Sequence, residues 1–92
     1  MIRTFACKDT EKLFLDIPVR KFSGFERVAR RKLMMVSAAD RLDDLRIPPN
    51  NRLEALKGDR DGQHSIRINR QWRVCFRWQD GMAWDVEIVD YH

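Results

Sequence analysis

The fold is decided by residues 62 to 92, which read GQHSIRINRQWRVCFRWQDGMAWDVEIVDYH. Within this segment, apolar and polar residues alternate with a period of two over residues 64–68, 72–78 and 83–91, as in strands that bury one face. The connections between these runs are short, and the second contains the pair Asp80-Gly81, which is typical of β-hairpins. The segment therefore predicts three strands of a twisted antiparallel meander, with one face against the core and the other charged.

The alternation also assigns the side chains of these strands to two faces. One face collects large apolar side chains that we expect in the core: Ile66, Ile68, Trp72, Val74, Phe76, Trp78, Trp84, Val86 and Ile88. The other face carries Arg67, Arg73 and Arg77, and we expect Arg73 to face solvent there. Arg67 and Arg77 could also pair across strands with Asp85 or Glu87.

Two helices are predicted upstream of the strands. Asp9 or Thr10 can cap the first helix. The second begins at Ser23, because Glu26 follows three residues later in the pattern of a capping box and apolar residues then recur at helical spacing. Helices followed by strands predict an α+β fold, in which residues 1–92 form one domain with N-terminal helices packed on one face of the sheet.

The composition limits the classes of function. The 92 residues carry a formal net charge of +4, which favours a polyanionic partner. No apolar run is long enough to cross a bilayer, and the N-terminal residues lack the apolar stretch of a signal peptide, so we expect a cytoplasmic protein with no membrane contact. Cys7, Cys75 and the two histidines have no metal-ligand spacing, so we expect no metal and no other cofactor.

The residues left to carry chemistry are mostly basic. The chain has no serine on a nucleophile elbow and no glycine-rich phosphate loop. The remaining candidates are Lys57, Arg67, Arg73, Arg77, Asp90, Tyr91 and His92. They suit the cleavage of RNA by its own 2′-OH, which needs a base, cations beside the developing negative charge and an acid for the leaving oxygen. Histidine can move either proton, arginine holds phosphate oxygens, and an aromatic ring stacks on an unpaired base.

Three motifs, in this order, resemble the HigB toxins of the RelE-type toxin superfamily: LEALKGDR at 53–60, NRQWRVCF at 69–76 and DYH at 90–92. The resemblance covers the full length, and MIR at 1–3 with GQHSIR at 62–67 is most similar to the GraT-like branch. It implies a RelE-like fold and the toxin of a type II toxin–antitoxin system. Its activity would be that of a ribosome-dependent mRNA endonuclease that cuts A-site codons by metal-independent 2′-OH attack and so inhibits translation.

The resemblance also implies partners. The toxin would enter the A site of the ribosome and act on the mRNA there. A HigA-type antitoxin with a helix-turn-helix would neutralise it. Operator DNA would be reached indirectly, through the antitoxin, when the pair represses its own operon.

Site residues carry over from the resemblance position by position. Lys57 and Arg73 match contacts to the phosphate or the transition state, and Asp90, Tyr91 and His92 match a C-terminal active-site triplet. Within that triplet, His92 is the main candidate for proton transfer.

Glu54 departs from the pattern, because some HigB toxins have histidine at its position. A carboxylate can still act as a catalytic base, although it repels phosphate and cannot replace an imidazolium. Beside these catalytic candidates, we expect four further side chains to contact RNA: Arg60, His64, Arg67 and Arg77.

Two other functions remain open from the sequence. The same basic face would serve a non-catalytic RNA-binding or ribosome-binding module, or a subunit whose main role is autoregulation with an antitoxin. Single residues have ordinary structural explanations as well. His64 at the start of a strand suits an exposed surface position, and the pattern alone gives His92 no role.

Overall fold

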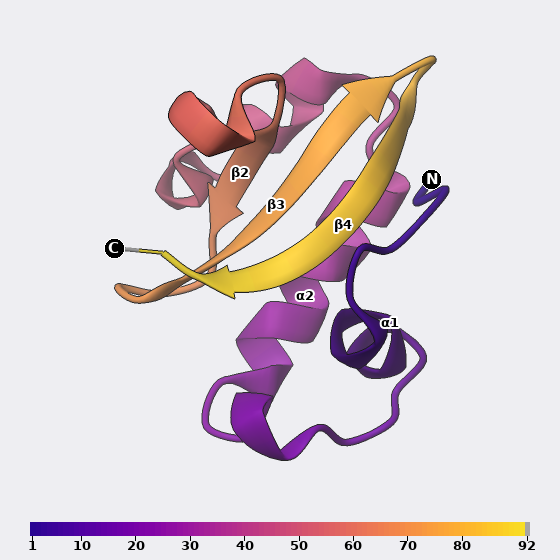
Figure 1. The fold of residues 1–92 in the computed structure, drawn as a ribbon, viewed down its shortest axis with the longest axis vertical. Coiled ribbons are helices and arrows are strands. Elements are labelled where there is room, and N and C mark those ends of the chain that lie inside the picture. The colour runs from indigo at the N-terminus through magenta and orange to yellow at the C-terminus, as the bar shows by residue number, and fades with distance from the viewer. Residues whose placement is uncertain (92) are drawn as a thin grey trace.

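The computed structural model describes residues 1–91, in which two α-helices precede a sheet of four strands (Figure 1). The helices are Lys8–Phe14 (α1) and Glu26–Ala38 (α2). The strands are Glu54–Ala55 (β1), His64–Arg67 (β2), Trp72–Gln79 (β3) and Met82–Asp90 (β4). They form one antiparallel sheet in the order β1-β2-β3-β4, so the predicted α+β fold and meander are confirmed.

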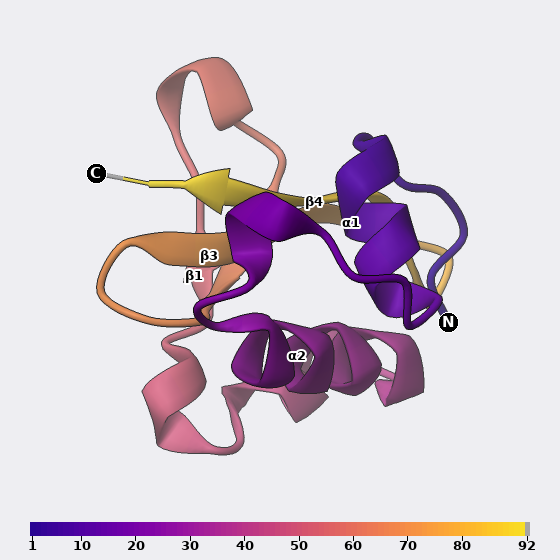
Figure 2. The ribbon, with the colours of Figure 1, turned by 90° about the horizontal axis from the view of Figure 1, so that it is seen from below.

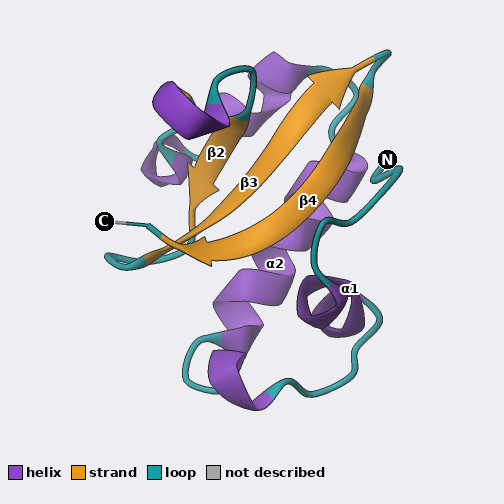
Figure 3. Cartoon of the chain, in the orientation of Figure 1, coloured by secondary structure: helices purple, strands orange, loops and turns teal. Residues whose placement is uncertain are grey.

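Shorter segments complete the fold. Four 3-10 helices lie in the connections: Arg20–Phe22 (η1), Leu42–Arg46 (η2), Pro49–Asn51 (η3) and Gly58–Arg60 (η4). Figure 3 shows how loops join η2 and η3 to the sheet after α2 ends. The N-terminal segment runs beside β4, because Ile2 and Phe5 form parallel bridges to Ala83 and Val86.

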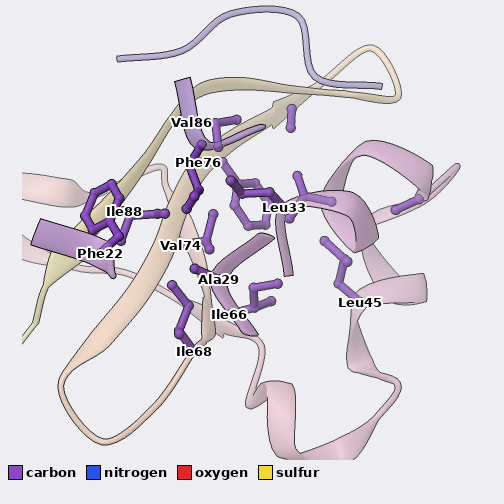
Figure 4. Close-up of a cluster of buried hydrophobic side chains, with 14 of the residues drawn as sticks. Phe22, Ala29, Leu33, Leu45, Ile66, Ile68, Val74, Phe76, Val86 and Ile88 are labelled. Carbon is purple, nitrogen blue, oxygen red and sulfur yellow. The ribbon is translucent and has the colours of Figure 1, made fainter. Parts of the chain in front are cut away.

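The core lies between α2 and one face of the sheet. Ala29, Leu33 and Val36 recur at helical spacing, so they form one stripe along α2, and all three are fully buried. They belong to one cluster with side chains from the sheet, several of which Figure 4 labels: Ile66, Ile68, Val74, Phe76, Val86 and Ile88. This apolar face of the sheet is turned toward α2, because its burial is favourable. The opposite face, which we call the outer face, is left for function.

Both predicted helix caps are wrong. Cys7 precedes α1 and Phe25 precedes α2, and neither side chain makes a capping hydrogen bond. Thr10 is instead fully buried, and its Oγ1 accepts a hydrogen bond of 2.9 Å from the backbone N–H of Ile88. The ring of Phe25 lies 5.0 Å from the ring of Trp72. Contacts with the sheet are therefore made near the starts of both helices, where no side-chain cap is present.

Trp84 does not lie on the face that the alternation predicts, because β4 contains a bulge. The register with β3 shifts between Trp84 and Glu87, and Asp85 takes a left-handed backbone conformation with φ 52°. As a result, Trp84 pairs with Arg77 and lies half-exposed on the outer face, while Ala83 takes the buried position. The prediction that Trp84 belongs to the core is therefore wrong, because an extra residue reverses the alternation beyond it.

The loop that carries η4 folds over the outer face, on the side of the sheet opposite α2 (Figure 2). Arg60 fastens this loop to β4, because its Nη1 lies 2.9 Å from Oε1 of Glu87. Beneath the loop, Ser65 and Cys75 are fully buried, and burial raises the pKa of the Cys75 thiol to about 11. Arg73 is only 8% exposed, so the prediction that it faces solvent is wrong.

Candidate active-site cleft

Four arginines surround a cleft of about 320 Å³ at one end of the outer face. The side chains that line it come from the residue after η3, from the start of β1, from β2 and β3, from the turn between them and from the residue after β4: Arg52, Glu54, Arg67, Asn69, Arg70, Arg73 and Tyr91. Four cations and one carboxylate make the cleft a site for anions. Of the predicted site residues, the structure brings together Glu54, Arg67, Arg73 and Tyr91.

Arg73 is the most tightly held of these cations. Its Nε donates to Oγ of Ser65 at 2.7 Å, and its Nη2 donates to the backbone carbonyl of Arg52 at 2.7 Å. Both acceptors are neutral, so they fix the guanidinium without cancelling its charge. An arginine has five N–H donors, so this anchoring leaves others for the oxygens of a ligand.

Glu54 brings a carboxylate to the same point. Its backbone pairs with Ser65 at the edge of the sheet, and its Oε1 lies 3.6 Å from Nη2 of Arg73. The side chain is half-exposed, so it can reach a ligand that contacts Arg73. A proton acceptor and a fixed cation thus lie side by side, as proton transfer next to a developing negative charge requires.

The turn between β2 and β3 supplies a second wall. Oδ1 of Asn69 accepts from the backbone N–H groups of Gln71 and Trp72, both at 2.8 Å, which closes the turn. Nε of Arg67 donates to the carbonyl of Asn69 at 3.1 Å, so Arg67 follows the turn. Arg70 is exposed at the tip of the turn and directs a further charge to the cleft.

Three cleft residues escaped prediction from the sequence: Arg52, Asn69 and Arg70. Asn69 and Arg70 lie inside the motif NRQWRVCF, between two arginines that were predicted. Arg52 directly precedes LEALKGDR, and it has left-handed backbone angles, φ 47° and ψ 57°. All three residues lie at or next to the first residue of a motif, which was the available signal in the sequence. Only folding brings the beginnings of the two motifs together.

The cleft does not include the other predicted residues that the structure describes: Lys57, Arg60, His64, Arg77 and Asp90. Lys57 is exposed ahead of η4, and Arg60 is paired with Glu87. Nε of Arg77 lies 3.5 Å from Oδ2 of Asp85, so the cross-strand pairing considered for Arg77 is confirmed.

His64 lies on the core side of the sheet. It pairs with Phe76 in the register of β2 and β3, and the two rings stack with their centroids 6.4 Å apart. Its Nδ1 is buried and makes no hydrogen bond with the residues that the structure describes. The ring is therefore turned away from the outer-face cleft.

The residues of the C-terminal triplet do not share one place in the structure. The backbone N–H of Tyr91 donates to the carbonyl of Gln71 at 2.8 Å, and its side chain, 38% exposed, lines the cleft. Asp90 pairs with Trp72, so it points to the other side of the sheet, where Oδ2 accepts from Nε2 of Gln71 at 2.9 Å. His92 lies outside the described residues.

Residues 1–91 lack two features, a metal-binding cluster and a membrane-spanning helix. This part of the chain has no group of three or more His, Cys, Asp or Glu side chains that could hold a metal ion. It also has no helix that is long and apolar enough to span a membrane. The chemical groups available at the cleft are therefore arginines, one carboxylate, one amide and one phenol.

Comparison with known proteins gives a family match over almost the whole chain. Residues 4–92 match the family described as the RelE-like toxin of the type II toxin–antitoxin system HigB. Toxin HigB-1 of Vibrio cholerae is 49% identical over 61 residues, which are 66% of this chain and 64% of that protein. Endoribonuclease HigB of Proteus vulgaris is 42% identical over 41 residues, 45% of each chain. The matched part thus spans less than two thirds of the length of each of these relatives.

Solved structures share the fold. The YoeB–YefM complex from Staphylococcus aureus contains a chain that matches with a TM-score of 0.62 at 19% identity, over 100% of this chain and 98% of that one. A heterotetrameric YoeB–YefM toxin–antitoxin complex from the same organism gives a TM-score of 0.58 at 18% identity with the same coverage. At such low identity these likenesses describe the arrangement of helices and strands.

Proposed function

Because the chain belongs to the family of HigB toxins, RelE-like toxins of type II toxin–antitoxin systems, we propose that it is an endoribonuclease that cuts mRNA on the ribosome. The cut would fall in the codon at the A site and would stop translation. The observation that carries the proposal is the fixed guanidinium of Arg73, held in a cleft with three further arginines and 3.6 Å from a carboxylate. A phosphodiester is the anion that this arrangement of donors fits.

The proposed reaction is attack by a ribose 2′-OH on the adjacent phosphorus. Glu54 takes the 2′-OH proton as the oxygen–phosphorus bond forms, and Arg73 stabilises the charge on the phosphorane oxygens. His92 gives a proton to the 5′-oxygen that leaves, a role that rests on the family motif. The products are a 2′,3′-cyclic phosphate and a 5′-hydroxyl, and no metal takes part.

Other side chains would hold the RNA. Tyr91, at the mouth of the cleft, can stack on an unpaired base. Asp90 would keep the C-terminal residues in place through Gln71. Lys57, Arg60 and Arg77 lie outside the cleft and remain proposed contacts to more distant parts of the RNA, Lys57 to a phosphate. The RNA contact expected of His64 is not proposed further, because its ring is on the core side of the sheet.

The proposed partners follow from the family. We infer that a helix-turn-helix antitoxin of the HigA type neutralises the protein in the cytoplasm and that the pair binds operator DNA. The two YoeB structures support an antitoxin partner, because both are titled as complexes with YefM. The GraT-like branch remains a prediction.

The experiment is to induce the protein in cells and to map the new ends of transcripts. Arg73→Lys keeps the charge but cannot reproduce the two anchored N–H groups, so we expect it to abolish the ends that the wild type produces. The matched control is Arg27→Lys, an exposed arginine of α2 that is far from the cleft in sequence and lies on the helix layer, and it should cut like the wild type.

A reporter transcript without a start codon separates ribosome-dependent from free cleavage. We expect no cuts in it, and equal cutting of both transcripts would contradict the ribosome dependence. Growth arrest without any new transcript ends would instead support an RNA-binding module that does not cut. Absence of both arrest and cuts would favour an autoregulatory subunit.

A further inference from the structure

Ser65 lies beneath the cleft and cannot touch RNA itself, because it is fully buried under the loop that carries η4. Its hydroxyl oxygen nevertheless accepts a short hydrogen bond, 2.7 Å, from Nε of Arg73. Ser65 is opposite Cys75 in the register of β2 and β3, and Cys75 is equally buried. An apolar residue would fill such a position, so the hydroxyl needs an explanation beyond packing.

Arg73 has a second anchor on its other side. The carbonyl of Arg52 accepts from Nη2 at 2.7 Å, and the left-handed angles of Arg52 turn that carbonyl toward the sheet. Such angles are rare in residues other than glycine and persist where the surroundings enforce them.

The surroundings of Arg52 supply that enforcement. Asn51, just before it, is fully buried, and its Nδ2 donates to the carbonyl of Leu45 at 3.1 Å. Its Oδ1 accepts from Nζ of Lys32 on α2, and burial lowers the pKa of that ammonium group. The network ties the backbone at residue 52 to the helix layer, so the second anchor of Arg73 is as fixed as the first.

We propose, on the basis of the nuclease function above, that Ser65 is a positioning residue whose hydroxyl sets the plane of the Arg73 guanidinium for the transition state. Two anchors on two different nitrogens define the plane of the guanidinium. Without the Ser65 hydroxyl, the remaining partners, the carbonyls of Arg52 and Ser65 and the carboxylate of Glu54, all contact Nη2, so Nε would lose its anchor. Since misplacement by about 1 Å can cost about 100-fold in rate, losing one anchor should be visible in kcat.

The test is a set of variants assayed on ribosomes programmed with mRNA. We expect Ser65→Ala to lower kcat about 10-fold to 100-fold while KM changes little, because the interaction belongs to the transition state. Ser65→Thr keeps the hydroxyl and should restore most of the rate. Cys75→Ala is the matched control, because it removes one buried atom from the cross-strand partner and leaves the hydrogen bonds of Arg73 in place, and it should cut at the wild-type rate.

A second readout does not depend on cleavage. The Nε–H of Arg73 should give a slowly exchanging signal in NMR spectra of the wild type and of Ser65→Thr, and this protection should be lost in Ser65→Ala. If Ser65→Ala does not fold, Ser65→Cys serves instead, because sulfur is a weak acceptor and should also lower kcat and protection.

Three results would overturn the proposal while the wild type still cuts. These are wild-type kcat in Ser65→Ala, retained protection of the Arg73 Nε–H in that variant, and a loss of kcat that a folded Ser65→Thr protein does not restore. A wild type that never cuts would defeat the nuclease function instead, and the NMR signals would still decide whether Ser65 holds Arg73.

Discussion

Arg73 and Arg77 lie four residues apart on the same face of β3, yet their surroundings differ. Arg73 is 8% exposed and is held by a hydroxyl and a carbonyl. The Arg77 side chain is 46% exposed and lies 3.5 Å from the carboxylate of Asp85, at the bulge of β4. The alternation of the strand makes the two arginines alike, and only the segments packed around them make them different.

The difference bears on the catalytic role proposed for Arg73. Two neutral acceptors orient the guanidinium of Arg73, and the carboxylate 3.6 Å from it, Glu54, is the proposed proton acceptor. A fixed orientation of this kind is the preorganisation that stabilises a transition state. Arg77 is held instead by an exposed ion pair with Asp85, and exposed pairs of this kind contribute little free energy. The Arg73 end of the outer face therefore fits the proposed cleavage better than the Arg77 end does.

The largest expected effect separates these two arginines directly. Arg73→Ala should lower the cleavage rate about 10²-fold to 10³-fold, the loss typical of removing one fixed donor to a transition state. It should also lower the free energy of unfolding by about 1–3 kcal/mol, because two acceptors lose their partner. Arg77→Ala should change cleavage by less than about fivefold and stability by less than about 0.5 kcal/mol. Similar losses of rate in both variants would remove the distinction.

Cys75 lies between the two arginines and reports whether the η4 loop seals the outer face. The pKa of its thiol is about 11 in the folded protein, above the ordinary 9.0, so folding keeps a proton that the unfolded chain loses between pH 9 and 11. Stability from this group is complete below pH 9 and falls by about 2–3 kcal/mol as the pH rises to 11. Urea unfolding of the wild type and of Cys75→Ala across this range measures the difference. Identical pH slopes in the two proteins would show that the middle of the face is open to water.

An aromatic side chain lies at each end of the outer face. Tyr91 lines the cleft, whereas Trp84 lies under the guanidinium of Arg3, 5.8 Å from its ring centroid. Loss of stacking on one base should make Tyr91→Ala bind about 5-fold to 100-fold more weakly to ribosomes carrying a 2′-O-methyl mRNA. Trp84→Ala should bind like the wild type and lose only stability. Equal weakening in the two variants would place the RNA along the whole face.

The smallest effect concerns Arg70, at the tip of the β2–β3 turn. If its charge meets a phosphate, Arg70→Ala should weaken binding a few-fold and reduce the slope of log affinity against log salt by about 0.7. Arg27→Ala, on α2, should leave the slope unchanged. Binding titrations at several salt concentrations measure both slopes. A slope that falls in Arg27→Ala but not in Arg70→Ala would argue for RNA on the helix layer.

Much of the fold was accessible from the sequence because it depends on local patterns. The period-two runs and the Asp80-Gly81 turn place β2, β3 and β4 within a residue or two of their observed bounds. The starts of α1 and α2 were not accessible, because neither has a side-chain cap and the contacts near them are to the sheet. The position of Trp84 also escaped, since a single bulge residue, Asp85, reverses the alternation and leaves no clear signal in the sequence.

The candidate site divides in the same way. Alternation places Arg67 and Arg73 on one face, and the motifs point to Glu54 and Tyr91, and these four meet at the cleft. His64 shares its alternation with Ile66, so its place on the core side could have been read from the pattern. The burial of Arg73 and the arrival of Arg52 and Arg70 depend on how loops fold over the sheet, which residue types alone do not encode.

The most direct test of the central claim is a single-atom change in the substrate. Ribosomes are programmed with an mRNA whose ribose at the mapped cut carries 2′-H in place of 2′-OH, and cleavage by the purified protein is compared with the unmodified mRNA, both with excess chelator added after the ribosomes are assembled. Attack by the 2′-oxygen beside Arg73 predicts a 2′,3′-cyclic phosphate and a 5′-hydroxyl from the unmodified mRNA, and no cut in the 2′-deoxy mRNA. Cleavage of the 2′-deoxy mRNA, or a 3′-hydroxyl product that requires Mg²⁺, would contradict the account.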